Sequence, residues 1–145
     1  MYAFASSEYG HLASRRVGVS AQAAFAFMSD ASLLGQWSLG CFAAHPAGDG
    51  EAHRGVSLFG TGGAHVRIEP LPDLAMIRYW VGEPGAMVPR ICAFVSPFSG
   101  EECIVSMLAL RTAEMGDQRW TSLCRTHETE LDLIKSQLET GFRMP

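Results

Sequence analysis

The chain has 145 residues, which suits one domain with a single hydrophobic core better than two domains. Hydrophobic residues make up 48% and charged residues 18%, so the composition is too apolar for an intrinsically disordered chain. The formal net charge is −4 and the densest basic pair is Arg15-Arg16, which argues against a nucleic-acid-binding protein.

Targeting signals and the spacing of cysteines bear on the compartment in which a protein works. The first residues lack the basic and apolar regions of a signal peptide, and the longest apolar stretch, around Ile104–Leu110, is too short for a membrane helix. We therefore expect a cytoplasmic protein without a membrane span. The four cysteines form no C-x-x-C motif and are interpreted as reduced, buried side chains. They are Cys41, Cys92, Cys103 and Cys124.

The first third of the chain predicts a strand followed by two short helices. Gly10–Val19 alternates between apolar and polar residues, as a strand does. Ser20 is a favourable N-cap for a helix over Ala21–Ser29, in which Phe25 and Met28 share one face. A second short helix is predicted to run through Leu33 and Leu34 to Trp37.

The middle of the chain predicts six short strands joined by turns rich in Gly and Pro, which is typical of an antiparallel meander. The predicted strands are Gly40–His45, His53–Phe59, Ala64–Glu69, Leu74–Val81, Arg90–Val95 and Cys103–Thr112. Because side chains alternate between the faces of a strand, three pairs are assigned to the interior. They are Val56 with Leu58, Val66 with Ile68, and Ile77 with Tyr79.

The last segment, Arg119–Thr140, contains no Gly or Pro and predicts one long amphipathic helix that ends before Gly141. Its apolar stripe comprises Trp120, Cys124, His127, Leu131, Ile134 and Leu138. A helix of this length can cover the apolar face of a sheet, but it cannot fill a strongly curved sheet to its mouth. The space that remains predicts a cavity for a small apolar ligand.

This order of elements resembles the START-like or SRPBCC superfamily, which is also called the helix-grip fold. The most specific stretch is VGVSAQAAFAFMSDASLLGQW, from Val17 to Trp37, and the Leu- and Ile-rich terminal helix is the second. The resemblance implies one α+β domain over residues 1–145. In it, a curved antiparallel sheet of about seven strands grips one long C-terminal helix, and two short helices follow the first strand. It also implies a cavity for a hydrophobic or amphipathic molecule.

The candidate ligand-binding residues are those expected at the wall of this cavity. They are Trp37, Leu58, Ile68, Tyr79, Met107, Trp120, His127 and Leu131. Tyr79 and His127 are the polar groups expected to orient the ligand, although His127 has a second interpretation as a core histidine bonded to a sheet carbonyl. Arg90 is interpreted as a solvated charge at a strand end or as a partner for a ligand carboxylate.

Two other functions remain open from the sequence. The first is an enzyme of the polyketide cyclase or dehydrase kind, with His127 or Tyr79 as the acid-base group. The second is a protein-interaction module of the chaperone-activator kind, with Met76, Trp80 and Cys92 in an exposed apolar patch. No catalytic motif, metal site or cofactor site is predicted, since His45 and His53 are interpreted as solvated loop residues. A homodimer is left open.

Overall fold

The computed structural model of the chain describes residues 8–48, 52–57 and 63–145. Its strands are β1 (Gly10–Val17), β2 (Phe42–Pro46), β3 (His53–Val56), β4 (Gly63–Leu71), β5 (Met76–Val81), β6 (Val88–Ser99) and β7 (Glu102–Leu110). Its α-helices are α1 (Ala21–Ser29), α2 (Leu34–Trp37) and α3 (Asp117–Thr140). Single 3-10 turns occupy Ala31–Leu33 and Pro72–Leu74. None of these helices combines the length and the apolar character needed to cross a membrane.

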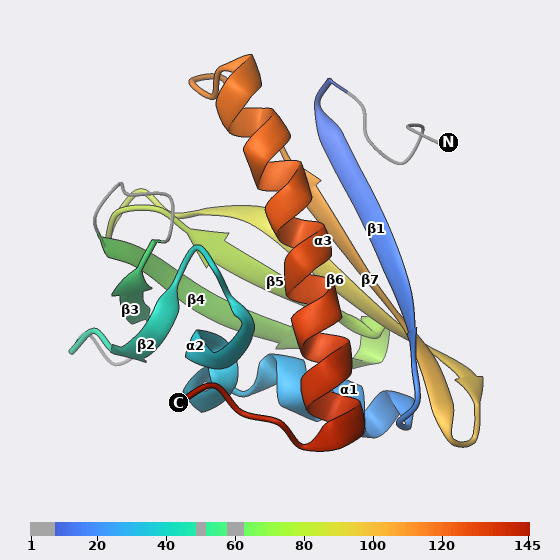
Figure 1. Cartoon of the computed structure of the whole chain (residues 1–145). Coiled ribbons are helices and arrows are strands. Elements are labelled where there is room, and N and C mark those ends of the chain that lie inside the picture. The colour runs from blue at the N-terminus through green and yellow to red at the C-terminus, as the bar shows by residue number, and fades with distance from the viewer. Residues whose placement is uncertain (1–7, 49–51, 58–62) are drawn as a thin grey trace.

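The strands form an antiparallel sheet in the order β1-β7-β6-β5-β4-β3-β2. Strands β2 to β7 are a meander in which each pairs with the next, and β1 pairs with β7 from Gly10 opposite Leu110 to Val17 opposite Cys103. The sheet curves around α3, which lies diagonally across its inner face, while α1 and α2 lie at one end (Figure 1). The predicted α+β helix-grip fold is confirmed.

The long helix α3 covers the inner face of the sheet with a stripe that is mostly apolar. It begins at Asp117, two residues before the predicted start, and Gly141 follows it with a φ of 75°, the left-handed conformation in which glycine is favoured. Its buried residues are Trp120, Leu123, Cys124, Thr126, His127, Glu130, Leu131, Ile134 and Gln137. Glu130 and Gln137 are therefore buried although the predicted stripe did not contain them.

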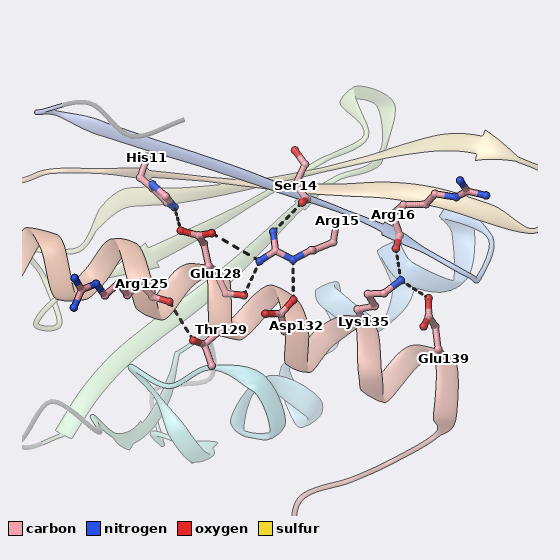
Figure 2. Close-up of polar contacts among 10 residues, drawn as sticks. All are labelled: His11, Ser14, Arg15, Arg16, Arg125, Glu128, Thr129, Asp132, Lys135 and Glu139. Atoms are coloured by element: carbon pink, nitrogen blue, oxygen red, sulfur yellow. Dashed lines mark hydrogen bonds and ion pairs between the residues drawn. The ribbon is translucent and has the colours of Figure 1, made fainter. Parts of the chain in front are cut away.

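Polar side chains on two sides of α3 form hydrogen bonds with different parts of the fold. Towards β1, Arg15 Nε donates to Asp132 Oδ1 at 2.7 Å, and Figure 2 shows this ion pair within a row of polar contacts along the helix. Towards α2, Gln137 Nε2 donates to the carbonyl oxygen of Gln36 at 2.8 Å. Exposed ion pairs contribute little stability singly, so we take this row as fixing where the helix lies.

The hydrophobic core occupies the half of the interior nearest to α1. On β7 the buried side chains are those of alternate residues, including Val105 and Met107, as expected for a strand with one face inward. Leu131 and Ile134 of α3 pack into the same cluster together with α1. Further along α3, towards its N-terminus, this packing gives way to a cavity.

Two details of the strands differ from the prediction. Strand β6 continues to Ser99, whereas residues 96–100 were expected to form a turn, and its pairing with β7 becomes irregular at Pro97. In β3 the predicted inward residue Val56 is 58% exposed, and the neighbouring Gly55 is buried. The prediction that Val56 points into the interior was therefore wrong. Leu58, its predicted partner on that face, lies outside the described residues.

Gly55 explains why β3 presents this face to the interior. A Cβ atom at Gly55 would lie 2.6 Å from the carbonyl oxygen of Phe42 and 2.7 Å from the carbonyl carbon of Cys41, both of which are main-chain atoms. A Gly55→Ala variant is therefore expected to lose about 1–3 kcal/mol of unfolding free energy in urea titrations. The control is Gly100→Ala, where a Cβ would meet nothing within 4 Å. Equal stability of the two variants would contradict this close approach.

The four cysteines are free thiols, of which Cys41, Cys103 and Cys124 are buried and Cys92 is half-buried. Burial raises the pKa of Cys41 to about 11, which makes it a poor nucleophile. On the outer face, the guanidinium groups of Arg67 and Arg78 stack on the Trp80 ring at 4.7 and 5.5 Å from its centroid.

Candidate ligand-binding cavity

A cavity of about 660 Å³ lies between the inner face of the sheet and the N-terminal half of α3. This volume is in the range of sites that hold small organic molecules. Its apolar wall includes Leu34, Trp37, Val66, Tyr79, Val81, Ile91, Met107 and Leu123. Its polar and charged lining includes Ser38, His65, Glu83, Arg90, Glu114, Arg119, Thr126, His127 and Glu130.

The apolar wall follows from the alternation of side chains along neighbouring strands. Val66 of β4 pairs with Val81 of β5, and Tyr79 of β5 pairs with Ile91 of β6, so these side chains reach the same face of the sheet. Met107 of β7 belongs to the same face. The sheet therefore contributes a continuous apolar surface that can bury the hydrophobic body of a ligand.

Arg90 reaches the cavity through a bulge in β6. Tyr79 pairs with Ile91 and Val81 pairs with Val88, so Pro89 and Arg90 together oppose a single residue of β5. Without the extra residue, Arg90 would have the same parity as Cys92 and point outward. A bulge re-aims a side chain in this way, and proline is tolerated there because the position needs no N–H donor.

The carboxyl group of Glu130 is buried at the wall of the cavity. Its Oε2 accepts a hydrogen bond of 2.7 Å from the amide of Leu39, and the amide of Gly40 donates a second bond to the carboxyl group. Burial nevertheless raises the pKa of Glu130 to about 7, against the opposing effects of these bonds and of Arg90. Glu130 can therefore give or take a proton close to neutral pH.

His127 lies one turn before Glu130 on α3 and also faces the cavity. Burial, followed by the charges of Arg90 and His11, lowers the pKa of His127 to about 3, so its imidazole is neutral near pH 7. Its Nε2 lies 4.0 Å from Glu130 Oε1, which is too long for a hydrogen bond and is not an ion pair while His127 is neutral. Its buried Nδ1 has no hydrogen-bond partner among the described residues.

The aromatic side chains of Trp37 and Tyr79 meet at the wall in an edge-to-face arrangement, with ring centroids 5.6 Å apart. The Tyr79 hydroxyl donates a 2.7 Å hydrogen bond to the carbonyl oxygen of Met28, and burial raises the pKa of Tyr79 well above its usual range. Its proton is thus held by the protein. The buried Nε1 of Trp37, by contrast, has no partner among the described residues.

The eight residues predicted from the sequence fall into three groups. Trp37, Tyr79, Met107 and His127 lie together at the cavity wall. Ile68, Trp120 and Leu131 lie elsewhere: Leu131 is in the core, Ile68 packs against it, and Trp120 joins a second cluster with Ala109 and Leu123. Leu58 lies outside the described residues. Whether the first group binds a ligand stays a prediction.

Sequence reasoning missed Glu130, and it interpreted Arg90 mainly as a solvated charge. A signal for Glu130 was present, because it lies three residues after His127 and four before Ile134, on the same face of the helix. The sequence carries no comparable signal for Arg90, because the direction in which its side chain points depends on the bulge in β6. Among the described residues, no group of three His, Cys, Asp or Glu side chains is placed to hold a metal ion.

Solved structures of other proteins share the fold of this chain. No protein-family model matches the chain, and no curated protein matches it. A START superfamily protein from Mycobacterium smegmatis superposes with a TM-score of 0.66 at 13% identity, over 92% of this chain and 99% of that one. The aromatase/cyclase Zhui from a Streptomyces species gives 0.66 at 12% identity, over 90% and 93% of the two chains.

A third solved structure extends the same likeness. The di-domain aromatase/cyclase BexL superposes with a TM-score of 0.67 at 15% identity, over 90% of this chain and 46% of that one. Identities this low show a shared fold and leave the function undetermined. The chain has the START-like, or helix-grip, fold, in which the sheet and the long helix enclose the cavity described above.

Proposed function

We propose that the protein binds a small, largely hydrophobic molecule in the cavity between its sheet and α3. The observation that carries this proposal is the cavity of about 660 Å³, whose lining combines an apolar surface of the sheet with polar and charged side chains of the sheet and α3. That combination supplies burial for a ligand body and orientation for a ligand head. The START-like neighbours support the proposal at the level of the fold.

Binding is favoured over the two alternatives by the placement of their key residues. The cyclase or dehydrase hypothesis used His127 or Tyr79 as the acid-base group, but His127 has a pKa of about 3 and the Tyr79 hydroxyl is bonded to Met28. The interaction-module hypothesis needed exposed apolar side chains around Trp80. That ring is stacked against two arginines, and its Nε1 donates to Glu69 Oε1 at 2.8 Å.

The proposal predicts that filling the cavity abolishes binding without unfolding the protein. The neutral fluorescent probe 1-aminoanthracene is expected to bind the wild-type protein, and native mass spectrometry tests for a co-purified molecule. In Ile91→Trp, which extends an indole into the cavity from β6, probe affinity is expected to fall roughly tenfold or more. Because the new ring enters open space, stability should change little.

The matched control is Phe94→Trp, which changes another residue of β6 by parity on the outer face. It is expected to bind 1-aminoanthracene as the wild type does. Binding that is undiminished in Ile91→Trp, or reduced equally in both variants, would contradict the proposed cavity site.

A further inference from the structure

Arg90 lines the cavity without a carboxylate at ion-pair distance among the described residues, unlike four other arginines of the chain. Arg15, Arg16, Arg78 and Arg111 each have a carboxylate oxygen within 4.0 Å. Within residues 8–48, 52–57 and 63–145, Arg90 has no such ion pair, and its buried Nη1 has no hydrogen-bond partner. Arg90 is half-buried, and because its guanidinium group stays charged, the buried Nη1 needs an acceptor.

Glu130 lines the same cavity but forms no ion pair with Arg90 in the described part of the chain. Burial and the charge of Arg119 lower the pKa of Arg90, and the charge of Glu130 opposes them. The Oε2 of Glu130 accepts a hydrogen bond from the amide of Leu39. The two side chains therefore face the cavity without pairing. Arg90 is also aimed inward by the β6 bulge, a local rearrangement that regular pairing with β5 would not produce.

Among the described residues, three others that line the cavity carry a buried polar atom without a hydrogen-bond partner. The Nε1 of Trp37 can only donate a hydrogen bond, and Trp37 is 3% exposed. The Nδ1 atoms of His65 and His127 are likewise buried without a partner in the described part of the chain. A group with several acceptor lone pairs would satisfy a guanidinium and an indole N–H together. A carboxylate has four such lone pairs and matches the fork of an arginine.

We propose that the natural ligand is an organic acid with an apolar body, whose carboxylate pairs with Arg90 while the body packs on the sheet wall. This inference rests on the proposed function and narrows it to one chemical class. The size of the cavity and its apolar wall of Val66, Val81, Ile91 and Met107 set the body of the ligand. The bulge, which turns Arg90 inward, and the unpaired guanidinium group favour a carboxylate as the polar head of the ligand.

The test compares two probes of the same shape and different charge, 2-naphthoate and 2-naphthamide, by displacement of 1-aminoanthracene and by calorimetry. Wild-type protein is expected to bind the carboxylate at least about tenfold more tightly than the amide. In Arg90→Gln this preference is expected to disappear. In Arg90→Lys, which keeps the charge and loses the bidentate fork, part of the preference should return.

The control for net charge is Arg54→Gln, because Arg54 is exposed on β3 and does not line the cavity. It should keep the full preference for the carboxylate. Equal binding of the two probes by the wild type, or a preference that survives in Arg90→Gln, would overturn the inference and leave the binding function standing. Failure of both probes and of 1-aminoanthracene to bind folded protein would overturn the proposed function as well.

Discussion

In Glu130→Gln, the free energy of unfolding is expected to rise by about 2 kcal/mol between pH 4.5 and 6.5, whereas the wild type should change much less. This expectation comes from two buried groups whose pKa values move in opposite directions on folding. Burial raises the pKa of Glu130 from 4.5 to about 7 and lowers that of His127 from 6.5 to about 3.

The sign of each contribution follows from which state binds more protons. Between pH 4.5 and 7, Glu130 is protonated when folded and ionised when unfolded, so stability falls as the pH rises. Between pH 3 and 6.5, His127 is neutral when folded and protonated when unfolded, so stability rises with pH. Each slope is about 1.4 kcal/mol per pH unit, and from pH 4.5 to 6.5 they cancel.

The cancellation is tested by removing each group in turn and measuring urea unfolding at several pH values. In Glu130→Gln, stability should rise with pH because only His127 titrates. In His127→Gln, stability should fall with pH because only Glu130 titrates. The double variant should resemble the wild type. His11, whose pKa burial also lowers, adds a rising contribution common to all four proteins. Parallel pH profiles for the two single variants would show that these groups do not titrate as described.

The fold could be predicted from the sequence because its elements are marked by periodicity and by strong end signals. The step of three and four residues along α3, the cap at Ser20 and the glycine after Thr140 are all local features. The structure confirms each of them, including the hydrogen bond from the Ala23 amide to the Ser20 hydroxyl. The meander of β2 to β7 also needs little long-range information, since each of these strands pairs with the next in the chain, and β1, which pairs with β7, is the exception.

The candidate site could be predicted only in part because its polar end depends on contacts between distant segments. Four of the eight predicted residues line the cavity, and they were found from the parity of strands and the stripe of the helix. Arg90 required a shift of register between β5 and β6, which no property of either strand alone indicates. Glu130 is stabilised in the interior by the amides of Leu39 and Gly40, about 90 residues away along the chain.

Binding of 2-naphthoate is expected to weaken about tenfold between pH 6 and 8, because ionisation of Glu130 places a negative charge in the same cavity as the ligand carboxylate. The groups that face Glu130 are the Leu39 and Gly40 amides, His127 on its own helix, Tyr79 on β5 and Arg90 on β6. Over this range His127 and Tyr79 stay neutral and Arg90 stays charged, so none of them accounts for the change.

By reciprocity, a carboxylate bound beside Arg90 raises the pKa of Glu130, so binding near pH 7 should take up protons. Calorimetry of 2-naphthoate in two buffers of different ionisation enthalpy measures that uptake. Glu130→Gln is expected to bind equally well at pH 6 and pH 8 without proton uptake, whereas His65→Gln, which removes the other cavity imidazole near the strands, should keep the wild-type profile. If Glu130→Gln loses affinity with rising pH as the wild type does, the pH dependence arises from another group and not from repulsion between Glu130 and the ligand carboxylate.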